Sequence, residues 1–429
     1  MKRTMIALAV GAAFAAPAAY ADVTLSGSIN AGPAWVKSND GSSGQANSIR
    51  STVGATTGQT SGQTTTGINT NYTNITIGSM EDLGGGLKLD FAYQFTANFQ
   101  SVTASPQNRN SHIGLVGDNW GGVWIGTNEN LYERYFYTVD PLDGAAGMGG
   151  NLQMFGTPGY GQVFDAPGAN LRNTADFYRR TDQTVWYDSP NWGGFTFGAY
   201  TTLNAYKTGN TALSNPGVWG VGGKYVGPTV PIQAWVAYER HKDLNGLGQI
   251  TGSNAVALAG LPGTPATAFG NATASVGQST VPTSTRDQGI QVGVGYTLGD
   301  LFLFAQYEGL KYKADGLSAA TDIIEYKRNA WGLGVKWNVT TGYVGAQYIH
   351  AMNGSCQSVG GGCGASQTGG DMVGVGYYHT LSKQTQAYIM ATWIGNDDLN
   401  QYNTAGGVGA VNRLGASIFG ATIGLKHSF

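Results

Sequence analysis

The stretch that decides the fold reads Leu87-Lys88-Leu89-Asp90-Phe91-Ala92-Tyr93-Gln94-Phe95-Thr96-Ala97. Apolar side chains occupy its odd positions, and polar or small ones occupy its even positions. This period of two predicts a β-strand with one apolar face. A strand of about eleven residues, tilted by about 45°, is long enough to cross the hydrocarbon core of a bilayer.

The same alternation recurs along the chain, in 195–200, 331–339 and 419–426. A soluble β-sandwich would alternate as well, so the composition has to decide the solvent. Charged residues make up 11% of the sequence, against about 25% in a typical soluble domain. Outside the first 21 residues no run of 18 apolar residues occurs, which argues against a helical membrane protein. The sequence therefore predicts an all-β protein, a transmembrane barrel.

Connections between the alternating segments fall into two classes. The short ones are Glu81–Gly86, Gly117–Gly122, Ser189–Gly194, Gly227–Thr229, Leu298–Asp300, Val339–Gly342 and Ser382–Thr385. The long ones include Leu131–Arg180, Leu244–Thr285 and Gly354–Gly370. Tight turns that alternate with long loops are typical of outer-membrane barrels, whose turns face the periplasm. We expect about sixteen antiparallel, up-and-down strands, a number that leaves a lumen wide enough for water.

The N-terminus has the form of an export signal. Lys2 and Arg3 precede the apolar run Met5–Ala19, and Ala19-Tyr20-Ala21 fits a small-x-small cleavage site. A buried N-terminal helix is the alternative. We predict a signal peptide over residues 1–21, cleavage after Ala21, and a single barrel domain over residues 22–429.

Cys356 and Cys363 lie in Gly354–Gly370, a segment rich in Gly, Ser and Gln. Two cysteines cannot supply the four ligands of a structural zinc site. In an oxidising compartment after export, we expect them to form a disulfide. A free catalytic thiol is the weaker alternative, because no histidine nearby would generate a thiolate.

Five segments carry a resemblance to a known family. They are Val23–Gly27, Glu81–Lys88, Tyr187–Phe195, Leu381–Thr385 and Gly424–Phe429. In this order, spread over nearly the whole mature chain, they resemble the trimeric general porins of Gram-negative outer membranes, most of all the β-proteobacterial branch. The resemblance implies a homotrimer of 16-stranded barrels, with the third loop of each folded into its lumen as a constriction.

Catalytic and cofactor motifs are missing from the sequence. The five histidines form no HExxH pair, no serine lies in a G-x-S-x-G elbow, and the spacing of Gly293, Gly295 and Gly299 is one residue too long for a dinucleotide fingerprint. We predict a protein that is not an enzyme and holds no cofactor or metal. The formal net charge of −2 argues against a nucleic-acid partner, which requires clustered positive charge.

Leu131–Arg180 is the most informative loop, because its length far exceeds the usual limit of about 12–15 residues for an unstructured connection. It follows the fifth expected strand, Val123–Asn128, where the resembled family has its constriction loop. The resemblance implies loop carboxylates that face cations on the wall. The candidate constriction residues in the loop are Glu133, Arg134, Asp140, Asp143, Asp165, Arg172, Asp176, Arg179 and Arg180. For any one of them, a solvated loop residue is the alternative.

The wall departs from the resembled pattern at three positions. The family carries arginines in its fifth strand and often a basic residue before the first turn, where this sequence has Trp124, Thr127 and Ser79. Candidate replacements on the wall are Arg179, Arg180, Arg328 and Lys336. We therefore expect weak ion selectivity, with a preference for cations rather than anions.

These features predict an outer-membrane channel for passive diffusion of ions and small hydrophilic solutes. A solute-specific channel, suggested by Trp124 and the ring-rich loop, and a secreted β-rich adhesin or lectin are the alternatives. The expected partners are two further copies of the chain, outer-membrane lipid and lipopolysaccharide, and the barrel-assembly machinery. In the resembled family that machinery recognises an aromatic C-terminus, here Phe429.

Overall fold

A computed structural model describes residues 22–41, 62–97, 106, 108–143, 147–159, 175–203, 216–251, 282–403, 408 and 415–429. The predicted signal peptide and its cleavage after Ala21 lie outside the described residues, and so do Asp165 and Arg172 of the loop. They stay predictions.

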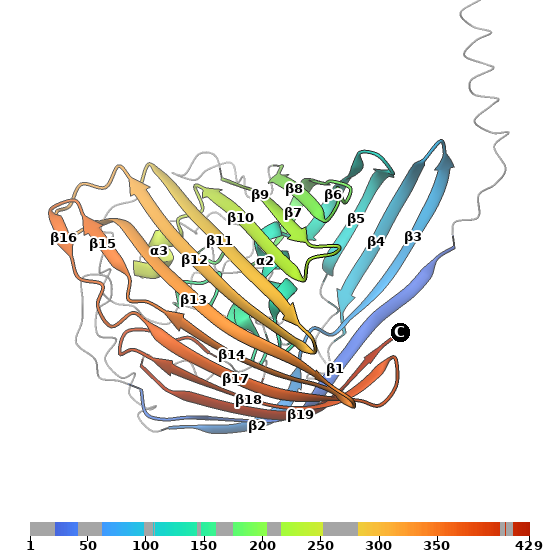
Figure 1. The fold of residues 1–429 in the computed structure, drawn as a ribbon. Helices are drawn as coiled ribbons and strands as arrows, with labels where there is room; N and C mark the ends of the chain where they lie inside the picture. The colour runs from blue at the N-terminus through green and yellow to red at the C-terminus, as the bar shows by residue number, and fades with distance from the viewer. Residues whose placement is uncertain are drawn as a thin grey trace, which may run out of the picture.

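Strands make up most of the described chain (Figure 1). They are β1 (Thr24–Ser38), β2 (Thr64–Thr70), β3 (Asn74–Gly84), β4 (Leu87–Thr96), β5 (Asn108–Gly117), β6 (Gly121–Glu129), β7 (Arg180–Asp188), β8 (Phe195–Thr202), β9 (Gly217–Val226), β10 (Ile232–Lys242), β11 (Ser284–Leu298), β12 (Leu301–Asp315), β13 (Ile323–Val339), β14 (Gly342–Ala351), β15 (Ser355–Ser358), β16 (Gly361–Cys363), β17 (Gly370–Thr380), β18 (Thr385–Asn396) and β19 (Ile418–Ser428).

Short helical segments interrupt the sheet only in loops of the described chain. They are α2 (Leu131–Phe136), η1 (Tyr137–Val139), η2 (Asn151–Gln153) and α3 (Gly246–Thr251). Among the helices of the described residues, none has the length and apolar character that a membrane crossing requires.

The strands close into one antiparallel barrel, because β1 pairs with β19 from Ser28 opposite Ser428 to Ser38 opposite Ile418. β1 also pairs with both β2 and β3, which are two parts of one interrupted strand. β15 and β16 form a hairpin in the loop between β14 and β17. The barrel therefore has sixteen strands, as predicted.

The seven short turns lie where the sequence predicts them. The turn between β11 and β12 has two residues, Gly299 and Asp300, with Leu298 opposite Leu301. Gly299 has a φ of +59°, a conformation that glycine adopts at no steric cost and that a two-residue hairpin turn needs.

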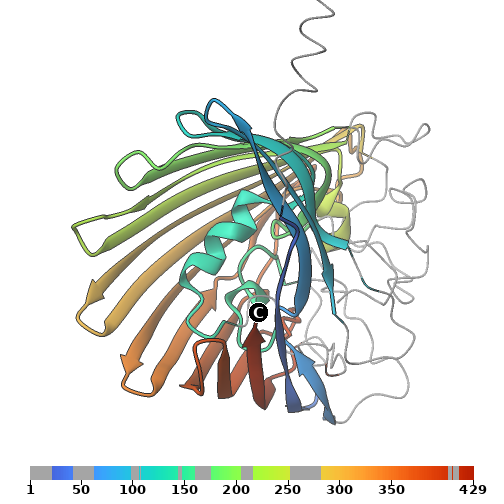
Figure 2. The same cartoon turned by 90° about the vertical axis from the view of Figure 1, so that its right-hand side faces the viewer.

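The alternation separates a lipid face from a lumen face. On β11 the outward side chains of Ile290, Val292 and Val294 are 41–49% exposed, whereas inward Asp287 and Gln291 are buried. The lumen side is buried because the loop after β6 folds inward: Figure 2 shows α2 and the segments that follow it inside the ring of strands.

The C-terminal residue takes part in barrel closure. The backbone N–H of Phe429 donates to the carbonyl of Gly27 at 3.1 Å, and the N–H of Gly27 donates to the carbonyl of Phe429 at 3.0 Å. The Phe429 ring is 38% exposed, so it is only partly packed against neighbouring side chains.

Deletion of Phe429 should slow assembly in cells far more than it destabilises a finished barrel. The deletion removes two of the backbone hydrogen bonds along the β1–β19 seam, each of which contributes about 1 kcal/mol. Outer-membrane yield and the refolding yield in detergent measure the two effects separately. Equal losses in both would show that the residue acts in packing and not in recognition.

Cys356 and Cys363 lie opposite each other on β15 and β16 and form the predicted disulfide, with their Cα atoms 5.6 Å apart. Replacing both by serine should leave the melting temperature of the barrel unchanged, because the bridge closes a short loop and contributes about 2–3 kcal/mol locally. Protease cleavage within the loop should become faster. A lowered melting temperature of the whole barrel would contradict this expectation.

Candidate channel constriction

The loop after β6 starts at a capped helix. The Asn130 side chain accepts a hydrogen bond from the backbone N–H of Glu133 at 2.7 Å and so caps α2. The amide nitrogen of the same side chain donates to the carbonyl of Phe177 at 2.7 Å and to Glu239 of β10 at 2.5 Å. One residue thus ties the beginning of the loop to its end and to the wall.

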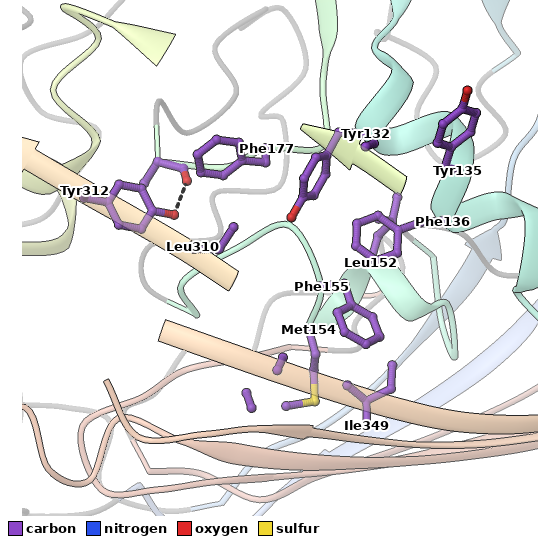
Figure 3. Packing of buried hydrophobic residues seen from close by; sticks show 14 of the residues in the cluster. Tyr132, Tyr135, Phe136, Leu152, Met154, Phe155, Phe177, Leu310, Tyr312 and Ile349 are labelled. Carbon is purple, nitrogen blue, oxygen red and sulfur yellow. Dashed lines mark hydrogen bonds between the residues drawn. The ribbon is translucent and has the colours of Figure 1, made fainter. Parts of the chain in front are cut away.

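Aromatic and aliphatic side chains of the loop form an apolar cluster against the wall (Figure 3). Phe136 stacks on Phe155 with ring centroids 5.0 Å apart, and Tyr132 lies 5.3 Å from Phe136. On the wall side, the Tyr312 hydroxyl donates to the carbonyl of Ala175 at 2.6 Å. These aromatic side chains therefore fix the position of the loop in the lumen.

Inward glycines of the wall give the loop room to lie close. A Cβ atom at Gly345 of β14 would come within 2.1 Å of the Pro141 carbonyl oxygen, and one at Gly374 of β17 within 2.6 Å of the Leu142 side chain. On β11, a Cβ atom at Gly289 would come within 2.7 Å of the Phe177 ring. These close approaches account for some of the 68 glycines among the 429 residues of the chain.

A buried ion pair holds the middle of the loop. Arg328 of β13 and Glu308 of β12 are both fully buried, with Nη1 and Oε1 2.5 Å apart. Glu308 also accepts from the Tyr132 hydroxyl at 2.9 Å and from the Gly156 backbone N–H at 2.6 Å. Arg328 donates in addition to the loop carbonyls of Met154 and Thr157.

Arg328 therefore anchors the loop, although the sequence suggested it as a cation facing the water. Glu133, Asp176 and Arg179 are also buried: they are 1–3% exposed. Burial keeps these charged side chains out of contact with the water of the lumen. The sequence pattern could not show this, because a loop residue has no period that predicts which way it points.

Beside η1 lies a cavity of about 340 Å³. Asp140 and Asp143 line it from the loop, and Lys336 of β13 and Lys426 of β19 line it from the wall. Lys426 forms an ion pair with Asp143, and Lys336 Nζ lies 4.0 Å from the centroid of the Tyr343 ring. Two carboxylates and two ammonium groups thus line one cavity, within the described part of the chain.

Lys426 is a lining residue that the sequence analysis missed. The signal was present, because Phe419, Ile423 and Leu425 mark the outward face of the last strand and Lys426 occupies the other register. The sequence analysis also missed Arg109 of β5, which lies on the wall. Its guanidinium lies 3.5 Å from Glu129 and 4.8 Å from the centroid of the Tyr72 ring.

Arg134 and Arg180, two further candidate residues, form ion pairs with carboxylates of the wall. Arg134 makes two hydrogen bonds to Asp188, at 3.0 and 3.1 Å, and Arg180 pairs with Glu129. The Tyr137 hydroxyl donates to Glu133 at 2.6 Å. Burial, together with the nearby Glu133 carboxylate, raises the pKa of Tyr137 well above its ordinary value, so this hydroxyl stays a donor.

Trp124 lies on the lumen face of β6 and stacks on Trp186 of β7, with centroids 5.9 Å apart and an interplanar angle of 14°. Its indole N–H donates to Asp90 of β4 at 2.8 Å, and His112 lies 3.3 Å from the same carboxylate oxygen. Where the resembled family has a cation, this wall therefore presents a pair of rings with a carboxylate.

Comparison with known proteins identifies the protein family. A family model described as Gram-negative porin matches residues 7–399. The chain belongs to this family. Outer membrane porin protein 32 of Delftia acidovorans is 28% identical over 438 residues, which cover 100% of both chains. An outer membrane porin of Bordetella pertussis is 28% identical over 224 residues, which cover 51% of this chain and 52% of that protein.

Two solved structures show the same fold as this porin. The anion-selective porin from Comamonas acidovorans has a TM-score of 0.67 at 22% identity, over 95% of this chain and 100% of that one. OmpT of Vibrio cholerae has a TM-score of 0.55 at 12% identity, over 95% and 99%. The porin is thus a β-barrel of the Gram-negative outer membrane and forms a channel for the passive diffusion of small solutes. Family membership decides against the adhesin or lectin alternative.

Proposed function

We propose that the mature chain, residues 22–429, assembles as a homotrimer of water-filled channels, each narrowed by its own loop 131–180. The observation that carries the channel part of this proposal is the cavity that Asp140 and Asp143 line together with Lys336 and Lys426. Charges of opposite sign across a narrow opening align water and act on solutes through a lower effective dielectric than exposed charges do. The mechanism is size exclusion, with weak discrimination by charge.

The trimer is supported by the fold alone. OmpT of Vibrio cholerae, which shares the barrel architecture, has been solved in a trimer form. We further propose that a leader over residues 1–21 directs export and that the barrel-assembly machinery inserts the protein. Outer-membrane lipid and lipopolysaccharide then surround the barrel. Family members act as channels and not as enzymes, and we propose no catalytic residue and no cofactor.

Conductance and oligomeric state test the proposal together. The refolded, detergent-extracted protein should migrate as a heat-modifiable oligomer. After its insertion into a planar bilayer, the current should fall in three equal steps as the channels close at high voltage. Liposomes that contain it should swell at rates that fall steeply with the size of the sugar supplied outside. Single equal steps from a monomeric band would contradict the trimer, and an absence of conductance would contradict the channel.

A solute-specific channel is the second candidate, favoured by the stacked Trp124–Trp186 pair beside Asp90. Rings with an adjacent carboxylate are suited to a sugar or to a cationic ring compound. Specificity would appear as saturable block of the ion current by one solute at millimolar concentration. Replacing Trp124 with alanine should abolish that block, whereas general diffusion predicts no saturable block by any solute.

A further inference from the structure

The outer surface of β10–β13 carries a band of positive charge at the loop end of the strands. Side-chain parity places six cations on the lipid face there: Arg240, Lys242, Arg286, Lys311, Lys313 and Lys327. Two carboxylates, Asp315 and Glu325, share this face among the described residues. We call these eight residues the basic belt. Its positive sign contrasts with the formal net charge of −2 for the whole chain.

The strand register brings like charges together in the basic belt. Lys242 is the cross-strand partner of Arg286, and Arg286 in turn is the partner of Lys313. One strand further on, Lys311 is the partner of Lys327. Like charges directly opposite each other destabilise a sheet. Three such pairs on four neighbouring strands (Figure 1) indicate that an anion from outside the chain balances them.

The carboxylates within the basic belt do not supply this balance. Glu325 is surrounded by Lys327, Lys313 and Lys311, with N–O distances of 2.6, 2.9 and 3.3 Å, and this quartet keeps an excess of positive charge. The three lysine side chains remain 34–48% exposed. Arg286 pairs with Asp315 at 2.9 Å, and both are about half exposed. The ammonium groups are therefore accessible from the membrane side.

The depth of the basic belt identifies its surroundings. On β10, β12 and β13 the outward cations are followed, toward the turn end, by the aromatic side chains of Tyr238, Tyr307 and Trp331. Below the rings the wall is aliphatic and exposed, with Val236 and Leu333 45% and 52% exposed. Aromatic side chains mark the membrane interface, so the cations lie at the level of lipid headgroups on the loop side.

We infer that the basic belt binds the phosphate groups of the acylated, phosphorylated glycolipid of the outer leaflet, the membrane anchor of lipopolysaccharide. Two features match this lipid: several cations spaced along neighbouring strands for more than one phosphate, and an apolar wall directly below them for acyl chains. The inference rests on the proposed function and on the expected orientation, in which the short turns face the periplasm and the long loops lie outside. On the next strands, β14 and β17, the outward face instead carries a histidine beside a carboxylate: His350 lies 2.8 Å from Asp371.

The probe is bisphosphorylated lipid A, compared with the same acylated disaccharide without its phosphates, titrated onto the refolded protein in neutral detergent and counted by native mass spectrometry. The wild-type protein should bind the phosphorylated form at least about tenfold more tightly. The triple variant K311Q/K313Q/K327Q should lose about a hundredfold in affinity for that form, following the contribution of each cation beside an anionic headgroup. Its affinity for the phosphate-free form should stay unchanged.

Matched variants protect this result from a folding artefact. The triple variant K311R/K313R/K327R keeps the charge and should bind like the wild type. E325Q removes the carboxylate and should bind more tightly, an effect that misfolding cannot produce. K88Q/K383Q removes two cations at the turn end of the barrel and should bind like the wild type.

Three results would overturn the inference: equal binding of both lipids by the wild type, undiminished binding by the glutamine triple variant, or complete displacement of the lipid by millimolar inorganic phosphate, which would indicate a site for free anions. The conductance of the wild type in a neutral phosphatidylcholine bilayer is measured separately. Failure of the channel there would contradict the proposed function and leave the binding result standing.

Discussion

Replacing Arg328 with methionine is expected to free the constriction loop from the barrel wall. The variant leaves the fully buried Glu308 carboxylate without its partner and removes the donor to the carbonyls of Met154 and Thr157. Removing one member of a buried ion pair destabilises a protein by about 3–5 kcal/mol. We expect this cost to fall on the loop, because the barrel strands keep their backbone ladders.

Single-channel recording and limited proteolysis measure the release of the loop. The variant should show a larger and noisier conductance, admit larger sugars into liposomes, and be cut within the loop by trypsin, while its heat-modifiable oligomer persists. The double variant Glu308→Gln/Arg328→Met removes both charges and should recover part of the protease resistance. Arg286→Met, which breaks an exposed pair with Asp315 on the outer face, is the matched control and should keep the conductance and the protease resistance of the wild type. A quiet, wild-type conductance for R328M would refute the anchoring role.

The second large effect concerns ion selectivity. Wild-type selectivity should be weak, because the two carboxylates and two lysines that line the cavity balance each other among the described residues. Removing the wall cations with K336Q/K426Q should shift the reversal potential in a salt gradient toward cations. Removing the loop carboxylates with D140N/D143N should shift it by a similar amount toward anions. At about 0.1 M salt the Debye length is near 10 Å, so charges inside the opening act on every ion that passes.

The sequence analysis assigned the same role to Arg179 and Arg180, and the structure changes that expectation. Arg179 is 3% exposed and Arg180 pairs with Glu129, so R179A/R180A should move the reversal potential less than K336Q/K426Q does. A larger shift from the arginine variant, or a tenfold anion preference in the wild type, would show that cations other than the two lysines control the ion current.

The alternation in Leu87–Ala97 and its repeats, the seven short turns and the low charge content were sufficient to predict the barrel, its strand number and its membrane setting. They were sufficient because a barrel wall has a strict period of two, so each side chain has only two faces to choose between. The pairing of Cys356 with Cys363 was also predictable, since only one partner existed for each. By the same period, Lys426 was readable as a lumen residue.

Only the tertiary structure decided what the loop and its charges do. Asp143 meets Lys426 across 283 positions of the sequence, and Tyr132 meets Glu308 across 176. Such meetings depend on where a loop without periodicity comes to rest, and that is set by the fit of its rings against inward glycines such as Gly289. The same packing turned Arg328 and Glu133 from expected pore charges into buried ones. Local pattern fixes the wall of this porin, whereas long-range packing of the loop fixes its opening.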